Sequence, residues 1–182
     1  MNKSNRWVAD IEHITQSFQS EFGQSSPEEL NWKPHPKTWS VAQNIDHLIT
    51  VNKTYFPTVT AIREGTYELP FTARFGFINR FFGNLILRTV SPDQRRKTKT
   101  LPLWEPEQSE LPPDILTRFV NHQEELKLFF QACEDLLEKQ IVISSPANKF
   151  ITYHLEAAFD IIVAHEKRHL QQARATLALK KM

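Results

Sequence analysis

Two histidines near the carboxyl end of the sequence, His165 and His169, are spaced for metal binding. They lie four residues apart in the segment His-Glu-Lys-Arg-His, so a helix stacks both imidazoles on one face. The same face carries apolar positions such as Ile162, so both side chains are expected to point inward. Neutral imidazoles are good ligands for zinc, nickel or iron. The alternative is a pair of inward histidines that only form hydrogen bonds with their neighbours.

This segment also matches the His-Glu-x-x-His signature of zinc peptidases, in which the glutamate, here Glu166, is the general base. Those enzymes need a third ligand after the motif, and the thirteen residues that follow His169 contain no His, Asp, Glu or Cys. We therefore expect no peptidase activity and a third ligand from upstream. Glu166 is either a catalytic base or partner of the site, or a half-exposed charge on the helix.

Three upstream histidines compete for the role of third ligand. His47 lies at the edge of the apolar stripe of a predicted helix, where it faces a groove next to a neighbouring helix. His122 lies near the centre of another apolar stripe, and His154 shares an edge with His165. Spacing alone does not choose among them.

Other polar side chains near these histidines are candidates for supporting roles. Asn44 precedes His47 by one turn and Gln172 follows His169 by one turn, so either can bind substrate or orient a ligand. Cys133 falls within an apolar stripe, which favours a small buried hydrophobe over a nucleophile.

Four amphipathic segments must position these residues. They run from about Asn5 to Phe22, from Ser40 to near Gly65, from Asp114 to Leu137, and from near Thr152 almost to the end. Pro57 is expected to kink the second segment or to end its regular part. Ser40 and Gln43 have capping-box spacing. The sequence predicts an all-α four-helix bundle with a long crossover, residues 66–112, between its second and third helices. The alternative is a less regular α fold in which the middle segment forms a fifth helix.

The crossover contains two groups of residues with open roles. The phenylalanines at positions 71, 75, 77, 81 and 82 are expected to pack in the core or at a homodimer face. The basic run Arg95, Arg96, Lys97 and Lys99 is expected to be a solvated surface, with attraction of a cofactor carboxylate as the alternative. A connection of this length is also suited to cover a site.

Composition sets limits on the class of protein. The chain has 182 residues, is 40% hydrophobic and 24% charged, and has a formal charge of +1. We therefore expect a single domain over residues 1–182, a small-molecule substrate, and neither nucleic acid nor membrane as partner. The single cysteine excludes an intramolecular disulfide, and the amino-terminal segment has no continuous apolar core like that of a signal peptide. Both features favour a cytoplasmic location.

Three motifs in order give the chain a family resemblance. Trp39-Ser40 leads to His47-Leu48, Trp104-Glu105-Pro106 lies in the middle, and His165-Glu166-Lys167-Arg168-His169-Leu170-Gln171-Gln172 lies near the end. In this order and spacing, the chain resembles the DinB/YfiT superfamily over nearly its whole length. The resemblance implies a DinB-like four-helix bundle of up-down-down-up topology. It also implies that His47, His165 and His169 hold one zinc or nickel ion, and so selects His47 over its rivals.

The resemblance leaves the activity open. Characterised relatives include S-transferases that use the low-molecular-weight thiols bacillithiol or mycothiol, and a maleylpyruvate isomerase. Three protein ligands leave a coordination position free, which is typical of catalytic metal sites. The leading hypothesis is a metal-dependent thiol S-transferase or hydrolase that acts on a small electrophile. The alternatives are a non-catalytic metal-binding or stress-related module, and an interaction protein whose histidines are structural.

Overall fold

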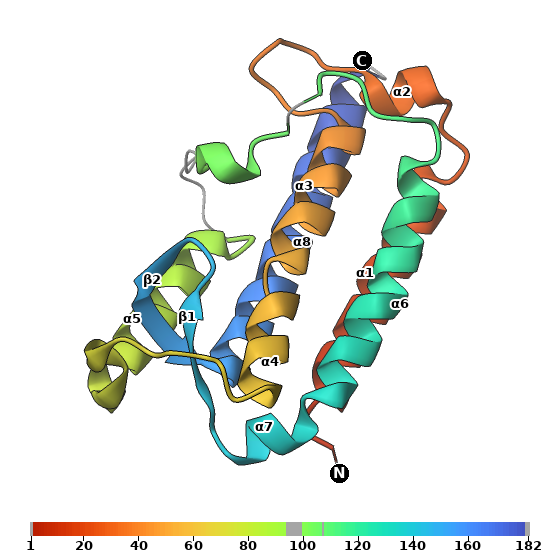
Figure 1. The fold of residues 1–182 in the computed structure, drawn as a ribbon. Coiled ribbons are helices and arrows are strands. Elements are labelled where there is room, and N and C mark those ends of the chain that lie inside the picture. Colours follow the sequence, from red (N-terminus) through yellow and green to blue (C-terminus); the bar gives the residue numbers. More distant parts are fainter. Residues whose placement is uncertain (1, 94–99, 107, 181–182) are drawn as a thin grey trace.

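A bundle of long helices forms most of the molecule (Figure 1). The computed structural model describes residues 2–93, 100–106 and 108–180. Helices α1 (Asn5–Phe22) and α3 (Val41–Lys53) each pack against both α6 (Ile115–Ala132) and α8 (Leu155–Lys180). This confirms the prediction of a mostly helical fold. The core lies between these helices, where apolar side chains from all of them are buried.

The first half of the bundle follows the sequence pattern closely. Helix α1 buries an apolar stripe at spacings of three and four, made of Trp7, Ile11, Ile14, Phe18 and Phe22. After the short helix α2 (Pro27–Asn31), a capping box starts α3: Ser40 Oγ accepts from Gln43 N at 3.0 Å, and Gln43 Oε1 accepts from Ser40 N at 3.2 Å. Of the two effects expected at Pro57, the structure shows the end of the regular helix: α3 ends at Lys53, and Pro57 lies in the first turn of a separate helix, α4 (Phe56–Arg63).

The third predicted helix is shorter than expected. Its regular part ends at Ala132, because Cys133 adopts φ −95° and ψ 6°, and a separate turn, α7 (Glu134–Glu138), follows. The break redirects the chain so that Leu136 and Leu137 are buried against the core. Asp114 precedes α6 as predicted, but its side chain makes no capping hydrogen bond.

A β-hairpin, which the sequence analysis did not predict, precedes α8. Strands β1 (Val142–Ser145) and β2 (Asn148–His154) pair antiparallel, with Ile143 opposite Tyr153. The prediction that the last helix begins near Thr152 is wrong, since α8 begins at Leu155. Thr152 and Tyr153 are residue types that favour strands, and both are buried in the hairpin. The chain is therefore mostly helical, with one small two-stranded sheet beside the bundle.

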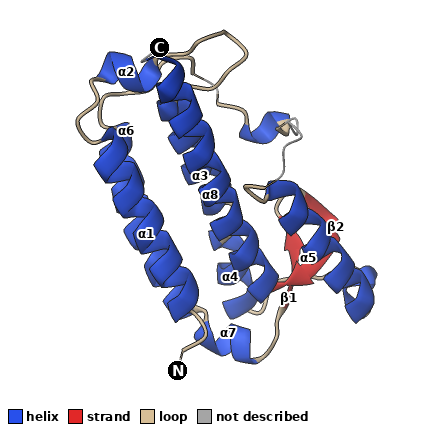
Figure 2. Cartoon of the chain, turned by 180° about the vertical axis from the view of Figure 1, so that it is seen from behind, coloured by secondary structure: helices blue, strands red, loops and turns tan. Residues whose placement is uncertain are grey.

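The crossover adds a layer beside the bundle. It contains the 3-10 turn η1 (Phe71–Arg74), helix α5 (Gly76–Val90) and the 3-10 turn η2 (Pro102–Trp104). Helix α5 packs against β2 and α8, and Figure 2 shows it crossing in front of the two strands. The predicted basic run at residues 95–99 lies outside the described residues.

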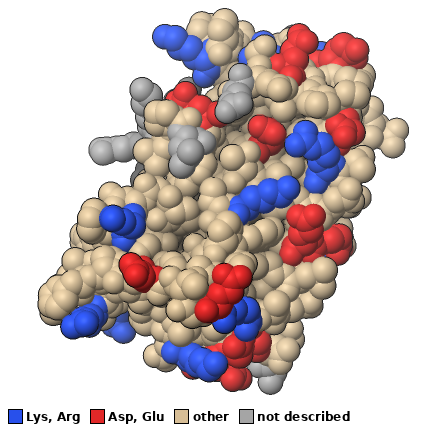
Figure 3. Space-filling model, in the orientation of Figure 1, with Lys and Arg blue, Asp and Glu red and all other residues tan. Residues whose placement is uncertain are grey.

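Surface properties agree with the near-neutral composition. Figure 3 shows positive and negative side chains interspersed over one face, rather than gathered by sign. Among the described residues, no helix is long and apolar enough to cross a membrane.

Candidate metal centre

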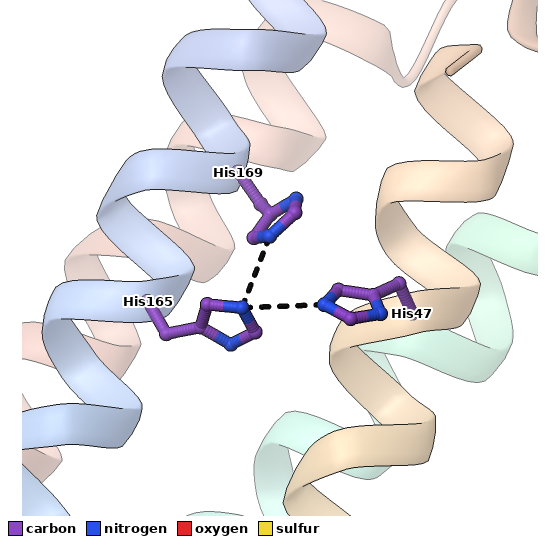
Figure 4. Close-up of side chains that lie close together, drawn as sticks. All are labelled: His47, His165 and His169. Atoms are coloured by element: carbon purple, nitrogen blue, oxygen red, sulfur yellow. Dashed lines mark hydrogen bonds between the residues drawn. The ribbon is translucent and has the colours of Figure 1, made fainter. Parts of the chain in front are cut away.

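Helices α3 and α8 bring three histidines together. His47 extends from α3, and His165 and His169 extend from successive turns of α8, so that all three rings point into the space between the helices (Figure 4). The Nε2 atom of His165 lies 3.2 Å from Nε2 of His47 and 3.0 Å from Nε2 of His169. One ligand atom from each residue lies within 4.8 Å of the others. The edge position of His47 on its helix is what directs it toward α8.

Hydrogen bonds on the outer side fix the orientation of two of these rings. His47 Nδ1 lies 2.8 Å from the carbonyl oxygen of Trp104, an atom that can only accept, so Nδ1 carries the proton. His169 Nδ1 lies 2.7 Å from Oδ1 of Asn44, whose Nδ2 donates to the carbonyl oxygen of Ser40 at 2.8 Å. His169 Nδ1 therefore donates as well. In their neutral forms, both rings direct an unprotonated Nε2 toward His165.

This arrangement leaves a lone pair without a donor. The Nε2–H of His165 can donate to Nε2 of His47 or of His169, but not to both at once. A cation bound between the three nitrogens would satisfy all of their lone pairs. The donor set therefore fits a metal ion better than it fits a closed hydrogen-bond network.

The distances also fit a metal ion. With zinc–nitrogen distances of about 2.0–2.1 Å, neighbouring nitrogens in a tetrahedral site lie roughly 3.3–3.4 Å apart. The observed separations of 3.0 and 3.2 Å are slightly shorter, so only a small expansion is required. Nickel and zinc both accept such nitrogen ligands, and the distances do not choose between them.

Burial keeps the three imidazoles neutral at physiological pH. It lowers the pKa of His47 to about 4 and the pKa of His165 to about 3, where the nearby His47 and Arg168 act in the same direction. Burial and the neighbouring histidines also hold the pKa of His169 well below its usual value. Neutral rings are the form that binds metal. The site is therefore prepared to receive a cation without first losing protons from imidazolium groups.

The rings differ in how much solvent they meet. His47 and His169 are buried, with 3% and 5% of their surface exposed, whereas His165 is half-buried. The half-buried indole of Trp39 packs on the buried pair, with ring centroids 4.9 Å from His47 and 5.8 Å from His169. Solvent can therefore approach from the side of His165, while Trp39 covers another side.

The last part of the crossover is attached beside this centre. In addition to the Trp104 carbonyl on His47, Gln43 Nε2 donates to the carbonyl oxygen of Gln108 at 3.0 Å. Asn31 and Leu111 exchange two hydrogen bonds, of 2.8 and 3.0 Å. The segment that leads to α6 is thus fastened to α2 and α3, and it contacts one of the three histidines directly.

Glu166 points away from the three histidines into the bundle. Its side chain is fully buried, and its carboxylate accepts hydrogen bonds of 2.7 Å from Asn52 Nδ2 on α3 and from Gln123 Nε2 on α6. Burial raises the pKa of Glu166 to about 7, and the two amide donors oppose that rise. Of the two alternatives that the sequence left open for Glu166, the half-exposed charge is wrong. The described contacts place Glu166 as a link between three helices.

The rival histidines lie elsewhere. His122 is buried near the ring of Phe56, at a centroid distance of 6.0 Å, and neither of its nitrogens has a hydrogen-bond partner among the described residues. His154 Nδ1 lies 3.0 Å from the carbonyl oxygen of Gln140, at the base of the hairpin. Neither joins the group of His47, His165 and His169.

The three other candidate residues, Asn44, Gln172 and Cys133, differ in how close they lie to the centre. Asn44 touches a histidine of the centre, as the sequence suggested. Gln172 is half-buried on α8, one turn beyond His169. Cys133 is fully buried, and burial raises the pKa of its thiol to about 12, which agrees with a packing role.

Sequence reasoning gave no role to two tryptophans of the centre. Trp104 contributes a backbone carbonyl, which no pattern of side chains can reveal. Trp39 lies just before the capping residue Ser40, outside the helical periodicity that pointed to His47. Its signal was only its place in the family-like motif.

Comparison with known families gives one match. The sequence model described as the DinB superfamily matches residues 10–173, a range that includes all three histidines. Comparisons with curated proteins and with solved structures gave no significant match.

Proposed function

The chain belongs to the DinB superfamily, and from this premise we propose that it is a metal-dependent enzyme acting on a small electrophile. His47, His165 and His169 would hold one divalent ion, zinc or nickel. The reaction would be transfer to a low-molecular-weight thiol, or hydrolysis. We also propose that the chain forms a single domain, and that its long helices follow the up-down-down-up order that the family resemblance implies.

The observation that carries the proposal is that the Nε2 atoms of all three histidines point toward one another. Those of His47 and His169 carry no proton, and the proton of His165 can lie on its other ring nitrogen. Two of the three rings are oriented by outer partners, Asn44 and the Trp104 carbonyl. Metal-binding histidines usually have such partners, because the outer hydrogen bond fixes the tautomer and the direction of the ligand lone pair. Histidines that only fill space have no need of this arrangement.

The number of ligands favours catalysis over a structural role. Structural zinc sites are usually closed by four protein ligands, whereas catalytic sites use three and keep one position open. The described residues supply three. When bound, such an ion would lower the pKa of a thiol or a water molecule in that position and so supply a nucleophile near neutral pH.

The surrounding residues suggest how a substrate is selected. The approach on the side of His165 is the more exposed one, and Trp39 offers an aromatic wall beside it. The crossover segment at Trp104 restricts the approach near His47. These features favour a small molecule over an extended polymer. The pairing of Glu166 with Asn52 and Gln123 makes Glu166 a positioning residue in this proposal rather than the base.

The direct test is metal content followed by an open-site assay. We expect about one equivalent of zinc or nickel per chain in protein purified without a histidine tag. In cobalt-substituted protein, the visible spectrum should change when cysteine or bacillithiol is added. The matched control is His122→Ala, which removes a buried histidine outside the centre.

Each outcome has a defined meaning. Absence of metal even after reconstitution would refute the metal centre. A spectrum unchanged by thiols, azide and pH would indicate a closed site and favour a non-catalytic metal-binding module. A responsive spectrum together with thiol-dependent consumption of an electrophile, lost in His165→Ala, would support the enzyme.

A further inference from the structure

Helix α5 presents a row of large apolar side chains, Phe77, Phe81 and Leu85, to solvent. The side that faces the hairpin and α8 carries Asn79 and Gly83, and a Cβ on Gly83 would lie 3.2 Å from the Cβ of Ala157. Asn79 is held there by Thr152 Oγ1, which donates to its Oδ1 at 2.6 Å. A small residue and a polar residue thus occupy this contact, while Ile86, Leu87 and Val90 are partly buried against the core farther along the helix. On the outer side, Phe77 and Phe81 remain 74% and 61% exposed.

These side chains belong to a larger aromatic face, defined here as Phe71, Phe75, Phe77, Phe81 and Leu85. The ring of Phe75 lies 5.4 Å from that of Phe71 and 6.0 Å from that of Phe77, and Phe77, Phe81 and Leu85 follow at helical spacing. At about 150–250 Å² for each aromatic side chain, their exposed fractions amount to roughly 500 Å². That is the upper range for an apolar patch on a monomer, and most of the ~800 Å² that one partner contributes to a stable interface.

A groove of about 780 Å³ runs beside this face. Phe77 and Phe81 line one rim, and the apolar side chains of Leu136, Leu137 and Ile141 contribute to its lining between the rims. The opposite wall is the first turn of α8 and the residues after it, with Glu156 and Asp160. Exposed aromatic side chains thus lie next to a groove with a partly apolar lining, which could receive side chains of the same kind from a second copy.

Charge on the two sides of the groove is also complementary. Residues 69–92 include Arg74, Arg80 and Arg88 and no acidic residue, and Arg80 lies at the aromatic rim. The opposite wall carries two carboxylates, Glu156 and Asp160, which share the single cation of Arg6 at 3.2 Å each. One side is therefore positive and the other has an excess of negative charge.

We propose that this face is a homodimer interface in which the aromatic rim of each copy enters the groove of the other. A twofold axis makes such contacts reciprocal. The contact between Arg80 of one copy and the acidic wall of the other would therefore occur twice in the dimer, once from each copy. An anionic lipid surface fits less well, because it is flat and would also meet Glu156 and Asp160. The proposal does not depend on metal or on catalysis.

The primary test is the mass of the protein in solution, by sedimentation equilibrium from about 1 to 100 µM. Wild type should be dimeric, and Phe81→Asp should raise the dimer dissociation constant at least about 30-fold, as expected for a central aromatic contact. Leu128→Asp on α6 is the matched control, because Leu128 is 65% exposed but lies outside the aromatic face. Circular dichroism and metal content should be unchanged in both variants.

A second test addresses the pairing of charges. Arg80→Glu should weaken the dimer, and combining it with Glu156→Arg should restore it. A monomer at all concentrations, or a dimer that Phe81→Asp does not weaken, would overturn the proposal. Binding of wild type, but not of Phe81→Asp, to vesicles of phosphatidylcholine and phosphatidylserine would also overturn it and assign the face to a membrane.

Discussion

Oδ1 of Asn44 accepts a hydrogen bond of 2.7 Å from Nδ1 of His169, one helix away. Because this bond directs Nε2 of His169 toward the other two imidazoles, its loss should weaken metal binding without removing a ligand. Loss of such an outer partner typically costs about 10–100-fold in metal affinity. We expect Asn44→Ala to show a loss of this size in competition with a chromophoric chelator.

Asn44→Asp provides the matched control for that experiment. A carboxylate keeps the acceptor for His169 Nδ1, replaces the amide donor to the Ser40 carbonyl by an oxygen, and adds a negative charge near the centre. Affinity should therefore stay closer to wild type than in Asn44→Ala. Equal affinities for wild type and Asn44→Ala would show that the ring is held by packing, for example by Trp39, and not by this hydrogen bond.

Removing a ligand should cost more than removing its partner. Loss of an outer partner lowers metal affinity by at most about 100-fold, and loss of a ligand should lower it further. We expect this larger loss in each of the variants His47→Ala, His165→Ala and His169→Ala. His122→Ala should leave affinity unchanged, since His122 lies on α6 beside Phe56. Metal titrations of the four variants under one buffer condition make the comparison. A loss confined to His122→Ala would mean that the wrong helix had been chosen.

The bound metal should also raise the stability of the fold. A ligand present at about 1,000 times its dissociation constant adds about 4 kcal/mol to the free energy of unfolding. Treatment with a chelator should therefore lower the melting temperature of wild type, and re-addition of zinc should restore it. The melting temperature of His165→Ala should not respond to either. A chelator effect of equal size in His165→Ala would place the metal elsewhere.

The stability of the metal-free protein should depend on His122 below neutral pH. Burial, together with the charge of Lys53, lowers the pKa of His122 from 6.5 to about 4 in the folded state. The unfolded chain therefore takes up a proton first, and stability falls as the pH decreases from 6.5 to about 4, by up to about 3 kcal/mol. Below that window both states are protonated and the loss ends.

Urea denaturation at several pH values can isolate this contribution. The difference in free energy of unfolding between wild type and His122→Leu should change across pH 4 to 6.5 and stay constant above it. Using chelator-treated samples of both proteins keeps the three histidines of the centre equal in the comparison. A difference that is flat with pH would show that His122 is not the group responsible.

Much of the centre was predictable because it depends on helical spacing. His165 and His169 share a face whenever residues 165–169 are helical, and the family-like motif pointed to His47. The role of Glu166 was less accessible, because its neighbours Asn52 and Gln123 come from two distant segments. The contact from Trp104 uses a backbone carbonyl, which every residue possesses, so the sequence offered no sign of it.

The fold was predictable where one apolar stripe faces one core. The stripe of α1 and the capping box of α3 are cases of this kind. The hairpin was not predicted, although Ile151, Thr152 and Tyr153 are strand-favouring types, because a pair of short strands carries no helical periodicity. Helix α5 agrees with the alternative of a helix in the middle segment, but its outward aromatic row opposes the usual rule that apolar residues face inward.

The buried carboxylate of Glu166 has a consequence for how α8 is seated along its own axis. A shift of α8 by one turn would move this group by about 5.4 Å, which would break both amide contacts and leave a buried carboxyl group without hydrogen-bond partners. The same shift would carry His165 and His169 past His47. The contacts of Glu166 in the core and the meeting of the three imidazoles therefore require the same position of α8 along its axis. The contacts of Glu166 hold the helix in that position even without a bound ion.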